Sequence, residues 1–252
     1  MSDTIVHPKT LRQRDMVLFT VSAILLLETL AGAASAGVSS VFWWCFLGVV
    51  FFIPFALISA EMGCAYPEQG GIYAWIRDAF GGRWASRATW CYWVNTAVWI
   101  PSIFIMWGGV FAQMFAPDMA LGWQIALGIA LTWLAVGVNV ITLDAGKWVP
   151  NLGAIIKVII FLAIIGGALV YIQDNGMANP ITLASLTPTW GEGLQYLPLL
   201  IYGMLGFELV SAGSEEMRNP ATDVPRAILY SGGIIITLYI LGTIAVLAAV
   251  PI

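Results

Sequence analysis

Residues 28–37 read ETLAGAASAG, and residues 202–208 read YGMLGFE. Each stretch places an acidic side chain beside glycines and other small residues, near the middle of a long apolar segment. Glycine inside a helix costs about 1 kcal/mol relative to alanine. An ionisable group at membrane depth costs at least about 2.5 kcal/mol. The two stretches therefore predict interrupted membrane helices, because broken backbone is tolerated in a bilayer only where it faces protein or a water-filled cavity.

The glycines allow a second interpretation, in which they are small contacts that let neighbouring helices approach closely. Two observations favour the interruption. Each stretch carries a carboxylate at depth, and the two stretches lie in the first and sixth apolar segments. Interrupted segments at matching positions of two halves of a chain indicate a transporter binding site.

The composition is that of an integral membrane protein, with 60% hydrophobic residues, 10% charged residues and a mean hydropathy of +0.88. A membrane helix needs about 20 apolar residues. By this measure the sequence predicts an all-α protein with seven spans, over residues 16–36, 41–62, 87–115, 121–140, 149–172, 194–213 and 228–250. The compact loops favour the cytoplasmic membrane of a bacterium.

Nine of the ten Lys and Arg residues lie in stretches that fall on one side of these spans. The loops near residues 36–41, 116–121 and 173–193 contain neither residue. Short loops rich in Lys and Arg stay in the cytoplasm, so the N-terminus is predicted to be cytoplasmic. The tenth cation, Lys157, lies inside an apolar segment and is the first candidate for a functional role.

The sequence gives little support for a metal site, a disulfide or a nucleic-acid-binding surface. The only histidine, His7, lies in the leader, and the three cysteines are isolated in apolar surroundings. We therefore expect no metal, no cofactor and no disulfide. No basic patch interleaved with aromatic residues lies outside the cytoplasmic loops, which argues against nucleic acid as a partner.

Interrupted helices would expose backbone groups that can bind a small ligand. The positive end of a half-helix can hold a carboxylate, and free carbonyls at the negative end can hold an ammonium or a coupling cation. A zwitterionic amino acid matches this pair of ends. We therefore expect a small-molecule substrate at the two breaks.

Two further groups of residues carry a resemblance to a known family. The first runs AEM at residues 60–62, YPEQGGIYAW at 66–75 and AFG at 79–81, and the second runs GFE at 206–208, EEMRNP at 215–220 and VPRA at 224–227. With this spacing the chain resembles the amino acid–polyamine–organocation superfamily of permeases over essentially its whole length, nearest the glutamate/GABA antiporter branch. In physical terms, Pro67, Gly70 and Gly71 predict a re-entrant or in-plane segment, and Pro220 and Pro225 predict a fresh turn before the last span.

The resemblance implies a fold of five plus five helices in inverted repeats, with the substrate at the breaks of helices one and six. It divides the chain into a cytoplasmic leader (1–15), a complete first repeat (16–172), an extracytoplasmic loop (173–193) and the start of a second repeat (194–252). Because the family has twelve helices, we expect this chain to be truncated after the seventh. The resemblance also implies that Lys157 occupies the place of a sodium ion next to the helix-one break, as a lysine does in several proton-coupled permeases.

These considerations give a set of candidate residues. For substrate binding they are Glu28, Thr29, Ala31, Gly32, Ala33, Tyr202, Gly203, Gly206 and Phe207, with Phe207 as an apolar lid; for proton coupling they are Lys157 and Glu208. Two of the assignments have alternatives. Lys157 could instead extend its side chain to the cytoplasmic interface, and Glu28 could be buried against another helix without touching substrate. We expect Glu208 to accept hydrogen bonds from freed backbone amides.

The function predicted from the sequence is secondary active transport of amino acids or related amines, by proton symport or substrate antiport. The alternative is a truncated fragment that binds ligand or associates with a partner, such as another copy, without transporting. A seven-helix receptor or photosensory protein is disfavoured because that class needs a lysine for retinal on the seventh helix, and residues 228–250 contain none. An intramembrane enzyme is disfavoured because Lys157 has no identifiable nucleophile partner.

Overall fold

The computed structural model describes residues 11–66, 68, 70–141, 148–188, 192–217 and 219–252. Among these residues the regular structure is helical, apart from one isolated parallel bridge between Leu11 and Met217. The chain forms two compact units, unit 1 with residues 1–71 and 147–252, and unit 2 with residues 72–146. The prediction of an all-α membrane protein is confirmed for the described residues.

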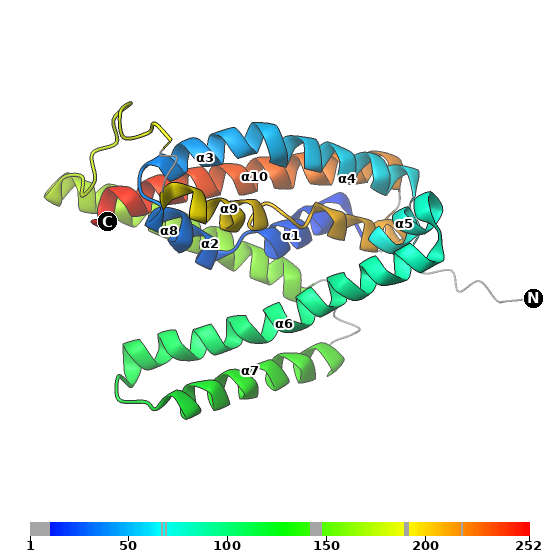
Figure 1. Cartoon of the computed structure of the whole chain (residues 1–252), viewed down its shortest axis with the longest axis horizontal. Helices are drawn as coiled ribbons and strands as arrows, with labels where there is room; N and C mark the ends of the chain where they lie inside the picture. The colour runs from blue at the N-terminus through cyan, green and yellow to red at the C-terminus, as the bar shows by residue number, and fades with distance from the viewer. Residues whose placement is uncertain (1–10, 67, 69, 142–147, 189–191, 218) are drawn as a thin grey trace, which may run out of the picture. The chain divides into compact units, whose positions relative to one another are not determined.

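Unit 1 contains most of the helices that Figure 1 labels. They are α1 (Gln13–Ile24), α2 (Leu27–Ser35), α3 (Ser39–Leu47), α4 (Ile53–Ala65), α8 (Trp148–Asn175), α9 (Leu197–Tyr202) and α10 (Pro220–Ala249). A π-helical turn, η1 (Gly48–Phe52), joins α3 to α4, and two 3-10 helices, η3 (Glu192–Tyr196) and η4 (Phe207–Glu216), flank α9. Unit 2 contains α5 (Ile72–Phe80), α6 (Gly82–Phe115) and α7 (Leu121–Ile141).

Six helical segments of the described chain are long and apolar enough to cross a membrane. The pair α1 and α2, bent by 45° at a short break, adds a seventh. With this pair counted as one span, the described helices agree with the seven predicted spans. The short helix α5 is separate from its neighbours along the chain, and Gly70 and Gly71 before it adopt φ of +143° and +48°. Pro67 lies outside the described residues.

The last span begins earlier than predicted, because α10 starts at Pro220 rather than near residue 228. Proline at the first helical position loses no intrahelical hydrogen bond, so Pro220 starts the helix without cost. Pro225 lies inside the helix and cannot donate to the carbonyl of Ala221. The thiol of Cys64 lies 3.6 Å from that carbonyl oxygen and faces the acceptor that Pro225 leaves free. Pro220 therefore starts one continuous helix, and Pro225 is accommodated inside it. The separate turn that was predicted before the last span does not form.

Helix α10 is the centre of unit 1, where it packs against α1, α2, α3, α4, α8 and η4. Figure 1 shows it running alongside α3 and α4. Its C-terminal end is capped by the segment after α8. The side-chain amide of Asn179 donates to the carbonyls of Leu247 and Val250, at 2.7 Å each, and the Ala178 N–H donates to Ala248 at 2.8 Å. These bonds satisfy carbonyls that a helix end leaves without partners.

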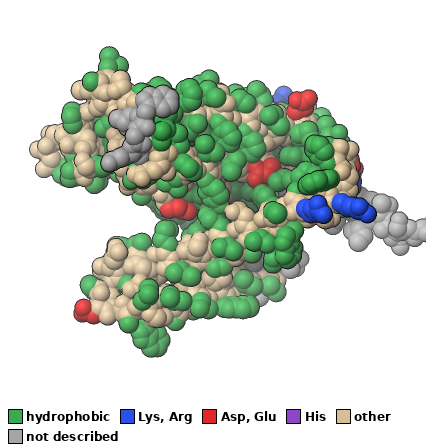
Figure 2. Space-filling view, in the orientation of Figure 1, with side chains coloured by type: hydrophobic (Ala, Val, Ile, Leu, Met, Phe, Trp, Pro, Cys, Tyr) green, Lys and Arg blue, Asp and Glu red, His purple; other side chains and the backbone are tan. Residues whose placement is uncertain are grey.

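Unit 2 is built around the hairpin of α6 and α7. The two helices approach closely at glycines: a Cβ at Gly108 would lie 2.6 Å from the carbonyl oxygen of Gln124, and one at Gly128 would lie 2.8 Å from the Cα of Ile105. Figure 2 shows apolar side chains over much of the visible surface of the protein, with few charges among them. Large apolar side chains such as Leu57 and Trp133 are exposed, which suits a surface that faces lipid.

Candidate functional site

The first span is interrupted at Leu25 and Leu26, which adopt extended conformations between α1 and α2. An interrupted first span was predicted, but its predicted position was wrong. The stretch of small residues after Glu28 is helical as far as Ser35 and includes Gly32. The alanines of this stretch are strong helix formers, and the backbone groups freed at Leu25 and Leu26 find partners on distant helices.

Two side chains from other helices take over the broken hydrogen bonds. In an uninterrupted helix the Leu26 N–H would donate to Ser22 O, and the Glu28 N–H would donate to Ile24 O. Instead, the hydroxyl of Tyr239 on α10 accepts from the Leu26 N–H at 2.9 Å and donates to Ile24 O at 2.6 Å. The ammonium of Lys157 on α8 donates to Ser22 O at 2.6 Å. The break is therefore stabilised by the tertiary structure.

Aromatic packing fixes the position of the Tyr239 hydroxyl. The ring of Trp44 stacks on Tyr239 with centroids 4.6 Å apart and an interplanar angle of 12°. Trp44 is held in turn by a 3.0 Å hydrogen bond from its indole N–H to the Thr243 hydroxyl. Phe161 contacts the Tyr239 ring at 6.1 Å in an edge arrangement. Sequence reasoning missed Tyr239, although a phenol at mid-span needs a hydrogen-bond partner, and that need was a usable signal.

The second interruption lies where it was predicted. Helix α9 ends at Tyr202, Gly203–Gly206 are not helical, and η4 begins at Phe207. Gly206 has a φ of +131°, which residues with a side chain rarely adopt. The carboxylate of Glu208 accepts a 3.0 Å hydrogen bond from the Gly206 N–H. This is the contact with a freed backbone amide that we expected of Glu208.

The two interrupted spans pack directly against each other. A Cβ at Gly203 would lie 2.5 Å from Cγ2 of Thr29, and one at Gly206 would lie 2.7 Å from Cγ1 of Ile24. A Cβ at Gly32 would overlap Leu199 of α9. The glycines thus permit close approach, as in the alternative interpretation, and this approach brings the two breaks together. Figure 1 shows α2 and α9 in the same part of unit 1.

Glu28 lies in the first turn of α2, directly after the break. Its Oε1 atom is buried and has no hydrogen-bond partner among the described residues. The nearby ammonium of Lys157 interacts with it electrostatically. Glu28 is therefore a carboxylate with a free acceptor position beside the broken backbone.

The other predicted residues lie in different surroundings. Thr29 is buried against Gly203, and Tyr202 is half-buried at the end of α9. Ala33 is in the packed core, and Ala31 is exposed on α2. The fully buried ring of Phe207 packs against Phe52 and Phe55 of the α3–α4 span, with centroids at 4.9 and 6.1 Å. The structure therefore brings Glu28, Thr29, Lys157, Gly203 and Gly206 together, and places Phe207 in the core.

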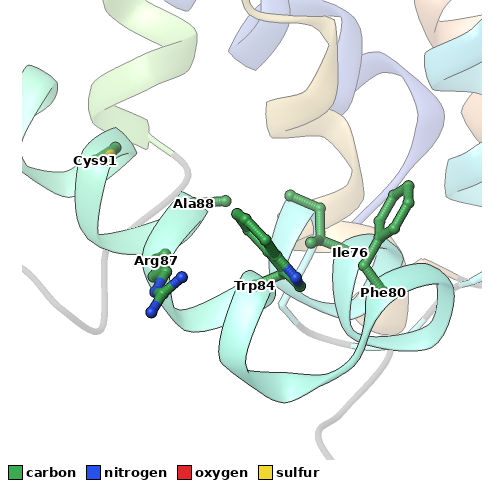
Figure 3. A pocket seen from close by; sticks show the side chains of 6 residues that line it. All are labelled: Ile76, Phe80, Trp84, Arg87, Ala88 and Cys91. Atoms are coloured by element: carbon green, nitrogen blue, oxygen red, sulfur yellow. The ribbon is translucent and has the colours of Figure 1, made fainter.

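A separate pocket lies in unit 2, between α5 and α6 (Figure 3). It has a volume of about 560 Å³ and is lined by Ile76, Phe80, Trp84, Arg87, Ala88 and Cys91. The guanidinium of Arg87 lies 5.3 Å from the centroid of the Trp84 ring, within range of a cation–π interaction. This pocket shares no residue with the two breaks.

Other charged groups lie outside the two breaks. The side chains of Glu215 and Glu216, and all of Arg218, lie outside what the structure describes, so the second group of family motifs is only partly visible. Arg77 forms an exposed 2.7 Å ion pair with its neighbour Asp78. Within the described residues, no group of three or more His, Cys, Asp or Glu side chains is placed to hold a metal ion.

Comparison with known proteins agrees with this architecture. A family model described as amino acid permease matches residues 11–252. The chain is 32% identical to a probable agmatine/putrescine antiporter of Lactococcus lactis over 236 residues, which are 93% of this chain and 51% of that protein. It is 33% identical to an uncharacterized transporter of Legionella pneumophila over 249 residues, 96% of this chain and 53% of that protein.

A more distant relative is a probable polyamine transporter of Arabidopsis thaliana, 27% identical over 214 residues, which are 81% of this chain and 41% of that protein. The chain spans about half the length of the curated relatives it matches. The finer placement near the glutamate/GABA antiporter branch stays a prediction. From the family match and the apolar helices together, this chain is a multi-pass integral membrane protein that belongs to the amino acid permease family.

Proposed function

We propose that this protein is a secondary active transporter of amino acids or related amines, working by alternating access in the cytoplasmic membrane of a bacterium. The observation that carries the proposal is the crossing of two interrupted helices, in which side chains from α8 and α10 hold the freed backbone groups of the first break. Such breaks form the substrate sites of transporters built from repeats. The names of two relatives, an agmatine/putrescine antiporter and a polyamine transporter, support the choice of substrates.

The substrate would bind beside the first break. Glu28 offers a buried, unpartnered oxygen to an ammonium group. Thr29, Gly203 and Gly206 form the contact between the two breaks and border the same place. Four residues of the flanking helices remain candidates for substrate contact: Ala31, Gly32, Ala33 and Tyr202. Phe207 would support the second break from the core.

Coupling to protons would run through Lys157, with Glu208 as a second carrier. A charged Lys157 donates to Ser22 O and interacts favourably with the charge of Glu28. A cationic substrate that binds to Glu28 would repel this ammonium, because like charges at a shared site disfavour each other. Loss of the proton from Lys157 would relieve the repulsion. One cationic substrate would then cross the membrane in one direction while one proton, or another amine, crosses in the other.

The test is uptake by the full chain reconstituted in liposomes. We expect it to accumulate labelled putrescine or an amino acid when a proton gradient or an internal substrate drives exchange. Lys157→Gln should reduce proton-driven uptake at least about tenfold and leave substrate exchange less affected, because only the former needs the titrating group. Arg14→Gln, which removes an exposed cation from α1, should change neither rate.

Absence of uptake of every amine and amino acid, by protein that remains folded and inserted, would contradict transport. The length of the relatives favours one alternative, a membrane fragment that binds ligand or a partner without transporting. Binding of substrate in detergent without any flux in liposomes would support that alternative. Association with another copy is tested on the same purified protein, because a homo-oligomer would have a mass that is a multiple of that of one chain.

A further inference from the structure

Glu28 lies at the N-terminal end of a half-helix, the kind of end that holds the acidic group of the substrate in transporters with broken helices. The N-terminus of a half-helix carries a partial positive charge and free N–H groups, and it attracts a carboxylate. Here that half-helix is α2, whose N-cap Leu26 provides no side-chain cap. Glu28 lies in its first turn. The protein therefore supplies its own carboxylate at this end of the helix.

One oxygen of Glu28 lacks a hydrogen-bond donor. Its buried Oε1 has no hydrogen-bond partner among the described residues, and an unpaired buried acceptor is costly. Lys157 lies close enough to interact electrostatically, but the hydrogen bond of its ammonium goes to the carbonyl of Ser22 at 2.6 Å and not to this oxygen. The hydroxyl of Tyr239 is likewise used by both backbone groups of the break. A donor from outside, such as a substrate ammonium, would complete the site.

We infer that Glu28 determines specificity, and that the site accepts amines without a carboxylate and rejects the corresponding amino acids. The inference rests on the proposed transport function and narrows its substrate class. A substrate carboxylate at the start of α2 would lie against Glu28, and two like charges in one desolvated site disfavour each other strongly. An alkyl amine or a diamine has no such group and pairs with the free oxygen of Glu28. Rejection by repulsion is a common source of specificity.

The test uses two substrates that differ by one carboxylate, putrescine and ornithine. In liposomes containing the full chain, unlabelled ornithine should compete with labelled putrescine at least about 100-fold less well than unlabelled putrescine does. Glu28→Gln should reduce this discrimination to less than about tenfold, because putrescine loses its charged partner and ornithine is no longer repelled. Glu28→Asp keeps the charge and should keep the preference. Glu61→Gln, which removes an exposed carboxylate from α4, should leave the discrimination unchanged.

A second measurement separates this inference from the proposed function. Thermal stabilisation of the detergent-solubilised chain reports binding whether or not the chain transports. Stabilisation by putrescine but not by ornithine, lost in Glu28→Gln and kept in Glu28→Asp, would support the inference even without flux. Equal stabilisation by both compounds, no stabilisation by either, or unchanged discrimination in Glu28→Gln would overturn it. Flux without discrimination would uphold transport and reject the role of Glu28.

Discussion

At the scale of single residues, Tyr239 bridges the two sides of the first break. One hydroxyl serves as acceptor for Leu26 and donor to Ile24, so a single side chain stabilises both sides of the break. Trp44 and Phe161 hold the ring, and they would do so equally for phenylalanine. The hydroxyl can therefore be removed without disturbing the aromatic packing.

Tyr239→Phe should lower the free energy of unfolding by about 1–2 kcal/mol, because two buried backbone groups lose their partner. It should also reduce transport, since the break loses the group that fixes its geometry. Thermal unfolding in detergent and uptake in liposomes measure the two effects. Tyr230→Phe is the matched control, since Tyr230 lies on the same helix and is 57% exposed. Equal behaviour of the two variants would show that the hydroxyl of Tyr239 contributes nothing particular.

At the scale of elements, the decisive contact is the crossing of the α1–α2 pair with α9 and η4. It depends on the absence of side chains at Gly203 and Gly206, where an added Cβ would meet Thr29 and Ile24. Gly206 also requires a φ of +131°. The crossing and the second break therefore depend on the same glycines.

Gly203→Ala should destabilise the protein by about 1–3 kcal/mol, because the new methyl group overpacks a tight contact. Gly206→Ala should cost at least as much, since backbone strain adds to the clash. Gly233→Ala on α10 is the control: nothing lies within 4 Å of its Cβ position, so alanine there should be neutral or slightly stabilising. Thermal unfolding of the three variants gives the comparison. A loss in Gly233→Ala as large as in Gly203→Ala would contradict the assignment of the crossing.

At the scale of the whole molecule, the charge distribution predicts the orientation in the membrane, and α10 packs against most of the other helices of unit 1. Nine of the ten Lys and Arg residues lie in the leader and in every second loop, and this asymmetry predicts a cytoplasmic N-terminus. Asp78 on α5 and Asp118 in the turn between α6 and α7 are both exposed and fall on opposite sides in this topology. These two aspartates therefore provide a direct test of orientation.

In a background with Cys45, Cys64 and Cys91 replaced, Asp118→Cys should react with a membrane-impermeant maleimide in intact cells. Asp78→Cys should react only after the membrane is permeabilised, because the reagent cannot reach the cytoplasmic face. Labelling yield on a gel is the measurement. The reverse pattern would invert the topology, and equal labelling of both would show that the two positions are not separated by the bilayer.

The sequence by itself determined the helical class, the seven spans and the second break, because hydropathy and the glycines of residues 202–208 act locally. It also identified Glu28, Lys157 and Glu208 as the ionisable candidates for substrate binding and proton coupling. Only the tertiary structure decided where the first span breaks. Its freed groups bind Tyr239, which is 213 positions from Leu26, and Lys157, which is 135 positions from Ser22. No local pattern contains those partners, and the carboxylate and glycines of residues 28–37 placed the predicted break too late in the sequence. The direction of Phe207, too, was fixed by the distant rings of Phe52 and Phe55.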